Sequence, residues 1–327
     1  MNIIFIYILG IVLTTLIYLN SKKISLQTNL FKKGIDETPL LGGIGIYFFF
    51  ILGVCFFLVF EKEVIYTNLY LLIFSFIIFF IGILDDIFDL SYKFRLISIF
   101  LLLVLFLYLD NRFLLNELYF ETNNKTYVFK YLSYFLTPFF ILLLLNSMNM
   151  ADGINGISGI IFLSYFFLLF NQSNELNFFV IFIIISIFIF LIFNLNKKIY
   201  MGDSGIYFLA LLVSLYTIHE YKFGSSNLSC EKIFILFMIP GIDMFRLFCL
   251  RISKRKNPFK GDMNHLHHLL IKKYSHLTSL VIYIFLILWP NLILKFFAFN
   301  PSYLIILNII TYSLIIVYLN TYKKSND

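Results

Sequence analysis

Polar side chains recur at regular intervals just after one of the most apolar runs of the chain. Residues 139–145, FFILLLL, carry no charge and no hydrogen-bonding side chain, and NSMNMADGINGI follows at residues 146–157. Three amides and one carboxylate stand three positions apart in this segment, at Asn146, Asn149, Asp152 and Asn155. On a helix this spacing gathers them on one face. Polar groups at the mouth of a membrane span are costly to desolvate, so we interpret the segment as a binding site rather than a helix end that meets water.

Three carboxylates end a second apolar run. The segment GILDDIFDLSYKFR, residues 82–95, places Asp85, Asp86 and Asp89 within one helical turn, so that all three can point at one place. Carboxylates this close repel one another unless a cation or a proton intervenes. The pattern suits Mg²⁺, which prefers oxygen ligands, and equally suits one carboxylate held as a base. We favour a site over a solvated acidic loop because Asp85 directly follows an apolar run, and Arg95 can balance substrate phosphates.

Other segments carry single groups that can bind phosphates. Lys33 lies in FKKGIDETPLLGGIG, residues 31–45, which taken alone is an ordinary basic loop beside a span. Asp203, in YMGDSG, stands where another span begins. Its side chain can cap the helix, and a helix N-terminus also attracts anions. Asp243 and Arg246 lie inside a span, and we interpret them as a neutralising pair rather than as ligands.

A histidine-rich segment lies near the C-terminal end. The sequence NPFKGDMNHLHHLL, residues 257–270, contains His265, His267 and His268. Three histidines this close together rarely reach one zinc ion, and no Cys partners are present. Hydrogen bonds to a phosphate or a sugar fit better beside the Lys-rich flank.

The composition predicts an all-α, polytopic integral membrane protein with a single domain over residues 1–327. Apolar residues make up 61% of the chain and charged residues 13%, whereas a soluble domain carries about 25% charged residues. A span needs about 20 mostly apolar residues, so we predict about eleven transmembrane helices. The segments are 2–20, 40–60, 66–84, 96–115, 130–147, 157–171, 176–194, 204–221, 232–250, 276–298 and 301–320.

Lys and Arg are divided unequally between the two sets of alternating loops. Seventeen of the 25 basic side chains fall in the set that includes residues 21–39, 85–95 and 251–275, and six fall in the other set. The positive-inside rule places the richer set in the cytoplasm, the N-terminus outside and the C-terminus in the cytoplasm. The motifs outside the spans all lie in this set, so we expect the active site at the cytoplasmic face. The basic excess is thus a topology signal beside the lipid bilayer, and no soluble basic face predicts nucleic acid as a partner.

Taken in this order, the motifs resemble the polyprenyl-phosphate N-acetylhexosamine-1-phosphate transferase family, glycosyltransferase family 4. The matching segments are TPLLGG, DDIFD, NSMNMADGINGI, MGDSG and DMNHLHH, spread over residues 38–268. Each is loose alone, but five in the right order on one side of the membrane are highly specific. HLHH resembles the undecaprenyl-phosphate GlcNAc-1-phosphate transferase branch, because the phospho-MurNAc-pentapeptide translocase branch carries three consecutive histidines. One departure is Ile206, where the family often has a small residue.

The resemblance implies a multi-pass enzyme of the bacterial inner membrane. It would transfer N-acetylhexosamine 1-phosphate, most simply GlcNAc-1-phosphate, from a UDP-N-acetylhexosamine to undecaprenyl phosphate and release UMP. This is the first membrane step of cell-envelope polysaccharide synthesis, for example of lipopolysaccharide O-antigen. The implied cofactor is Mg²⁺, with Mn²⁺ as an alternative, and a homodimer is left open.

The resemblance also implies roles for individual residues. Asp85 or Asp86 would deprotonate or position the lipid phosphate, and Asn149 and Asp203 would hold the metal. The implied substrate-binding residues are Lys33 and Arg95 for phosphates, Asn155 for uracil, Asp152 with its role open, and His265, His267 and His268 for the sugar.

Two other classes of membrane protein remain as alternatives. A transporter also places charges among broken helices, but near mid-bilayer and between two similar halves, and this sequence shows no repeat. A membrane prenyltransferase also uses Asp-rich Mg²⁺ motifs, but they do not explain HLHH or the spaced amides. Release of UMP separates the three classes because only the transferase produces it.

The charge bias gives a test of the topology. Reporter domains fused after residues 120 and 260 should give opposite signals, because the first position lies outside and the second in the cytoplasm when eleven spans are counted. Equal signals from the two fusions would contradict the eleven-span arrangement.

Overall fold

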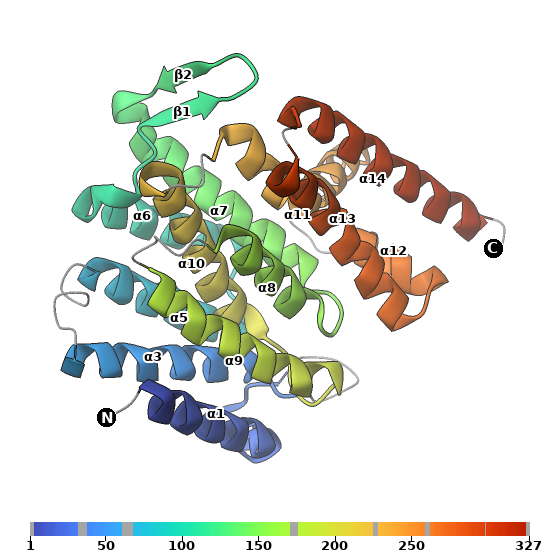
Figure 1. The fold of residues 1–327 in the computed structure, drawn as a ribbon. Helices are drawn as coiled ribbons and strands as arrows, with labels where there is room; N and C mark the ends of the chain where they lie inside the picture. Colours follow the sequence, from blue (N-terminus) through green and yellow to red (C-terminus); the bar gives the residue numbers. More distant parts are fainter. Residues whose placement is uncertain are drawn as a thin grey trace.

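The computed structural model describes residues 3–31, 38–60, 68–170, 176–224, 228–258, 262–297 and 299–324, and these ranges are mostly helical (Figure 1). The α-helices are α1 (Ile3–Leu19), α2 (Ser21–Thr28), α3 (Gly42–Phe60), α5 (Leu69–Phe88), α6 (Tyr92–Leu109), α7 (Ser133–Ala151), α8 (Ile157–Leu169), α9 (Asn177–Leu195), α10 (Gly202–Phe223), α11 (Cys230–Ser253), α12 (Leu266–Lys273), α13 (His276–Phe296) and α14 (Pro301–Lys324).

Each predicted span coincides with one helix, which confirms the all-α, polytopic membrane class. Eight of the described helices are long and apolar enough to cross a membrane. A ninth span is counted only if α1 and α2, which meet at a bend of 65°, form one unit. The predicted spans around α8 and α10 are not among these, because α8 has only 13 residues and α10 is too polar. The count of eleven therefore stays a prediction.

Two helix ends differ from the predicted spans in ways that matter for the site. Helix α5 continues to Phe88 instead of stopping at residue 84, so Asp85 and Asp86 belong to its last turn. Helix α6 begins at Tyr92, where the Ser91 hydroxyl accepts a hydrogen bond from the Phe94 N–H. Residues 85–95, which include the end of α5 and the start of α6, were predicted as one polar loop. Hydropathy alone does not detect a helix that continues into polar residues.

Helix α10 lies at the centre of the helix bundle (Figure 1) and packs against α3, α5, α7 and α8. All of its residues from Ser204 to Glu220 are buried. Because protein rather than lipid surrounds α10, it can carry side chains such as Ser214 and Thr217, whose hydroxyls donate to backbone carbonyls one turn back. This position explains why α10 is less apolar than the outer helices.

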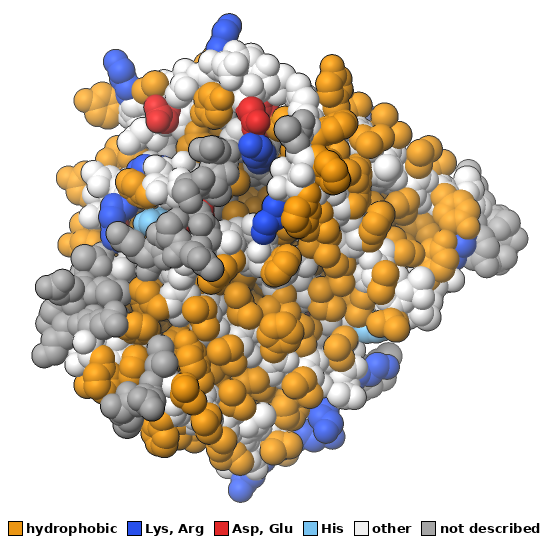
Figure 2. All heavy atoms as spheres, viewed as in Figure 1, with side chains coloured by type: hydrophobic (Ala, Val, Ile, Leu, Met, Phe, Trp, Pro, Cys, Tyr) orange, Lys and Arg blue, Asp and Glu red, His pale blue; other side chains and the backbone are white. Residues whose placement is uncertain are grey.

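The outer helices present a continuous apolar surface. Hydrophobic side chains cover the middle of the face seen in Figure 2, and most of its charged side chains lie toward the edges. Leu105, Phe188 and Phe285 are examples of large side chains that are exposed. A surface of this extent is suited to hydrocarbon rather than water.

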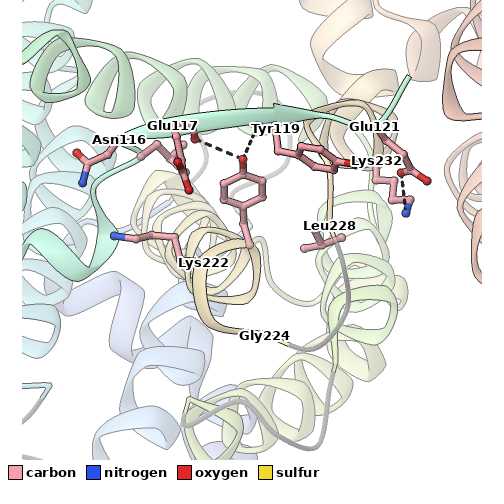
Figure 3. A pocket seen from close by; sticks show the side chains of 10 residues that line it. Asn116, Glu117, Tyr119, Glu121, Lys222, Gly224, Leu228 and Lys232 are labelled. Carbon is pink, nitrogen blue, oxygen red and sulfur yellow. Dashed lines mark hydrogen bonds and ion pairs between the residues drawn. The ribbon is translucent and has the colours of Figure 1, made fainter. Parts of the chain in front are cut away.

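A β-hairpin covers the end of the bundle where α10 finishes, although the sequence there predicts only a loop between two spans. Strands β1 (Glu117–Phe120) and β2 (Lys125–Val128) pair in antiparallel register, with Glu117 opposite Val128. A cavity of about 890 Å³ lies beneath it, between β1, the end of α10 and the start of α11 (Figure 3). Its polar side chains attach the hairpin to the bundle. The Tyr119 N–H donates to Tyr221 Oη at 2.6 Å, and Lys232 pairs with Glu121 at 2.8 Å.

Glycines allow the helices to meet closely at the other end of α10. A Cβ atom on Gly82 of α5 would overlap the Cα atom of Ser204, and one on Gly43 of α3 would overlap the backbone of Gly205. The Gly43 N–H also donates to the Met201 carbonyl at 2.8 Å. These contacts bring α3 and α5 against the first turn of α10.

The close approach at Gly82 can be tested by substitution. We expect Gly82→Ala to lower the free energy of unfolding by about 1–3 kcal/mol, because the methyl group forces two backbones apart. Gly241→Ala in α11 is the matched control, since nothing lies within 4 Å of its Cβ position. It should leave stability unchanged or raise it by up to about 1 kcal/mol through helix propensity. Thermal unfolding in one detergent compares the two, and equal losses would contradict the packing described.

Candidate active site

The first turn of α10 is capped by a carboxylate from a different helix. Asp86 of α5 accepts hydrogen bonds from the backbone N–H groups of Asp203 at 2.7 Å and Ser204 at 3.1 Å. The first N–H groups of a helix lack partners within it and carry partial positive charge, and a carboxylate satisfies both needs. Gly202 has φ of 76°, and a Cβ atom there would approach Asp86 Oδ2 to 2.7 Å. Asp86, rather than the Asp203 side chain, therefore caps α10.

Asp85 lies at the centre of a second network. Its side chain is only 3% exposed, and its Oδ2 accepts from Arg95 Nη1 at 2.8 Å and from the Tyr207 hydroxyl at 2.7 Å. Its Oδ1 accepts from the Leu90 N–H at 2.9 Å. A buried carboxylate is stable only when it is paired and hydrogen-bonded in this way. Asp85 consequently fixes the guanidinium of Arg95 and the hydroxyl of Tyr207.

Arg95 lies between two carboxylates. The same Nη1 atom is 3.9 Å from Asp203 Oδ2, and the Asp203 side chain is 30% exposed. Among the described contacts of Asp85, Asp86 and Arg95, none involves the Asp89 side chain, so the prediction that three carboxylates point at one place is wrong for Asp89. The reason is local, because α5 ends at Phe88 and Asp89 follows in the left-handed conformation with φ of 50° and an exposed side chain.

The segment that follows α7 is only partly helical. Asn146 and Asn149 lie in α7, but the helix ends at Ala151, so the predicted single polar face does not extend to Asp152 and Asn155. The Asn146 amide donates to the Leu142 carbonyl of its own helix at 2.9 Å. Asn149 Nδ2 instead lies 3.4 Å from the Tyr207 hydroxyl, which connects this segment to Asp85.

The glycines of the segment shape a loop. Gly156 has φ of 84°, and its N–H donates to the Asn194 side chain, whose amide donates to the Ile199 carbonyl at 2.7 Å. Asn155 is 9% exposed, and within the described residues its Oδ1 has no hydrogen-bond partner. Buried polar atoms are normally paired, so this atom points to a ligand.

The histidine segment lies against this same loop. A Cβ atom on Gly153 would overlap His267 and would meet His268 at 2.9 Å. His267 is 1% exposed, and in the described part of the chain neither of its ring nitrogens has a hydrogen-bond partner. Burial, and then the neighbouring histidines, lower the pKa of His267 to about 3, so it is neutral at physiological pH and can donate or accept one hydrogen bond at each nitrogen.

The first histidine of the segment, His265, is held by a carboxylate of α11. Its Nδ1 lies 2.8 Å from Asp243 Oδ2, and Asp243 also pairs with Arg246 at 2.8 Å. The neutralising pair predicted for Asp243 and Arg246 is therefore present. Lys33 lies outside the described residues.

Direct contacts thus join all five motifs. Backbone hydrogen bonds link TPLLGG to the residues before α10, Asp86 links α5 to α10, Tyr207 links Asp85 to Asn149, and Gly153 contacts the histidines. The arrangement provides a guanidinium, several carboxylates and unpaired hydrogen-bonding groups in one region. Such a set can bind a phosphorylated, hydroxyl-rich ligand.

Asn149 and Asp203 are suited to a metal that arrives with its ligand. Mg²⁺ usually keeps several waters and takes one or two protein oxygens together with substrate phosphates. Among the described residues no three His, Cys, Asp or Glu side chains form a cage, and the two predicted ligands are both partly exposed beside the Arg95 network. Their oxygens are of the kind that Mg²⁺ takes as ligands.

Two residues that organise the site were missed in the sequence. Tyr207 stands in an apolar run and offers no spacing signal, although it contacts both Asp85 and Asn149. Asn194 likewise looks like an ordinary polar residue at the end of α9. Only the pairing of distant segments reveals their roles.

Comparisons with known proteins identify one matching family model and several similar sequences. Residues 68–220 match the family model described as Glycosyl transferase family 4. The chain is 27% identical over 265 residues to the undecaprenyl-phosphate alpha-N-acetylglucosaminyl 1-phosphate transferase of Escherichia coli (strain K12), with 77% of this chain and 71% of that protein covered. It is 28% identical over 259 residues to the protein of the same name from Thermotoga maritima, with 78% and 75% covered.

Capping of α10 by Asp86 has a measurable consequence. We expect Asp86→Asn to lower the free energy of unfolding by about 1–3 kcal/mol, because an amide offers one acceptor atom and turns its NH₂ group toward a backbone donor. Asp89→Asn is the control, since its side chain is exposed, and it should change stability by less than about 0.5 kcal/mol. Thermal unfolding of both variants gives the comparison. A stable Asp86→Asn protein would show that the cap is dispensable.

Proposed function

We propose that the chain is a member of glycosyl transferase family 4, whose model its residues 68–220 match, and that it transfers N-acetylglucosamine 1-phosphate from a UDP-sugar to undecaprenyl phosphate and releases UMP. The relatives described above are named for this acceptor and this sugar phosphate. The observation that carries the proposal is the Asp85–Arg95–Asp203 cluster at the start of α10, joined through Tyr207 to Asn149. It supplies charge of both signs where a lipid phosphate and a soluble diphosphate can meet.

The reaction is a phosphoryl transfer. An oxygen of the lipid phosphate attacks the phosphorus that carries the sugar, the bond from that phosphorus to the bridging oxygen breaks, and UMP leaves with the bridging oxygen. A carboxylate base need only keep the lipid phosphate fully ionised, because the second pKa of a phosphate monoester lies near 6. Positioning and charge stabilisation therefore supply most of the catalysis.

The observed contacts divide the work among the acidic residues. Asp85 holds the guanidinium of Arg95 and is assigned to the lipid phosphate. The guanidinium can bind two oxygens of that phosphate at once. Asp86 fixes the backbone of Asp203 through the α10 cap. Asp203 and Asn149 would hold Mg²⁺, or Mn²⁺ in its place, which when bound neutralises the diphosphate and the departing UMP.

The UDP-sugar donor is assigned to the loop between α7 and α8 and to the histidine segment, His265–His268. Within the described residues, Asn155 Oδ1 and both ring nitrogens of His267 are buried and have no hydrogen-bond partner. We assign the Asn155 oxygen to the uracil and the His267 nitrogens to the sugar or its phosphate. His265, His268 and Asp152 border the same region, and Lys33 is assigned to a phosphate. We place this region at the cytoplasmic face of a bacterial inner membrane, where the soluble donor arrives for cell-envelope polysaccharide synthesis.

The proposal is tested by product release from purified protein. Wild-type protein with undecaprenyl phosphate, UDP-N-acetylglucosamine and Mg²⁺ should release UMP only when the lipid is present. Asp203→Asn should lower turnover by at least roughly 100-fold, the scale on which a positioned catalytic group acts. Asp89→Asn, which changes the same side chain outside the cluster, should retain wild-type turnover within about threefold.

Two results would count against the proposal. Absence of UMP with every UDP-N-acetylhexosamine offered would rule out the transferase. Wild-type turnover in Asp203→Asn would keep the transferase but remove Asp203 from its mechanism.

A further inference from the structure

A buried carboxylate outside the assigned site organises the start of the histidine segment. Asp243 of α11 is 3% exposed, and its carboxylate has hydrogen-bond partners from α11, from α14 and from the start of α12. Its Oδ1 accepts from Arg246 Nη2 at 2.8 Å and from the Tyr312 hydroxyl at 2.7 Å. Its Oδ2 lies 2.8 Å from His265 Nδ1, and the Leu266 N–H lies 3.2 Å from both oxygens.

The partners of Asp243 are themselves tied together. Arg246 Nε donates to the Tyr312 hydroxyl at 2.7 Å, and its Nη2 donates to the Asn264 carbonyl at 2.8 Å. The network therefore connects α11 and α14 to the first residues of α12. Removing one member of such a buried set leaves the others without a partner, which is far more disruptive than losing an exposed contact.

The residues held by this network are those that face the loop after α7. One and two residues beyond Leu266, the rings of His267 and His268 are the groups nearest to a Cβ position on Gly153. Their position is thus set from one side by the loop and from the other by the start of α12, which Asp243 holds through the Leu266 N–H.

We propose that Asp243 is a positioning residue, which with Arg246 and Tyr312 holds His265–His268 in the place where the segment binds the donor substrate. The inference rests on the proposed function, because it assigns these histidines to the UDP-sugar. It gives α14 a part in substrate binding, through Tyr312, although no residue of that helix belongs to the assigned site.

Hydrogen exchange tests the anchor without any substrate. In Asp243→Asn the Leu266 amide faces a weaker acceptor, and the charge that holds His265 and Arg246 is lost. Peptides covering residues 262–273 should then exchange at least about tenfold faster in detergent, which corresponds to losing one hydrogen bond to a charged group. Tyr165→Phe is the matched control, because Tyr165 is fully buried against Phe237 of α11 and, in the described part of the chain, its hydroxyl has no partner.

Steady-state kinetics tests what the anchor does. Asp243→Asn should raise KM for UDP-N-acetylglucosamine about tenfold and leave KM for undecaprenyl phosphate within about twofold of wild type. Tyr312→Phe, which keeps the carboxylate and removes one donor, should raise KM for the UDP-sugar about threefold even if Asp243→Asn does not fold. Tyr165→Phe should match wild type in both measurements.

The outcomes separate this inference from the proposed function. Unchanged exchange, unchanged KM for the UDP-sugar, or an equal rise in both KM values would overturn the positioning role while the transferase stands. Wild-type protein that releases no UMP would overturn the proposed function, and with it the donor role of the segment, whatever the exchange data show.

Discussion

The site depends on one electrostatic contact, the carboxylate of Asp86 against the first N–H groups of α10. This contact joins α5 to α10 and fixes the backbone of Asp203 in the first turn of α10. Tyr207, one turn further along α10, can then reach Asp85 from the same direction. Without the cap, the partial positive charge at the start of α10 would face the low-dielectric interior unpaired.

The same physical solution recurs at a second helix start in the described part of the chain. Asp243 of α11 accepts the Leu266 N–H at the start of α12, as Asp86 of α5 accepts those of α10. A soluble protein can leave helix ends to water, but helix ends packed inside a membrane protein need protein partners. Both capped helices carry groups that the proposed reaction uses. Helix termini of this kind therefore serve as fixed points on which reactive side chains are placed.

The sequence predicted the helices and the segments of the site better than their mutual contacts. Long apolar runs predict helices, and every predicted span contains one. The motifs around Asp85, Asn149 and Asp203 also lie close together, as predicted. Hydropathy could not locate the end of α5 or the hairpin. It did locate α8, but an apolar run of 13 residues is too short to distinguish a span from a buried helix. The partnership of Asp243 with His265 crosses 22 positions and leaves no local pattern.

Enclosure of α10 has a consequence for how the protein responds to hydrophobic mismatch. Bilayers of different thickness act on helices that touch lipid, mainly by changing their tilt. Outer helices such as α6 and α14 have most of their residues outside the protein core and can adjust in this way. Helix α10, buried from Ser204 to Glu220, offers lipid no surface on which to act. The carboxylates at its start should thus keep their mutual spacing across membranes of different lipid composition, because their distances are set by protein contacts alone.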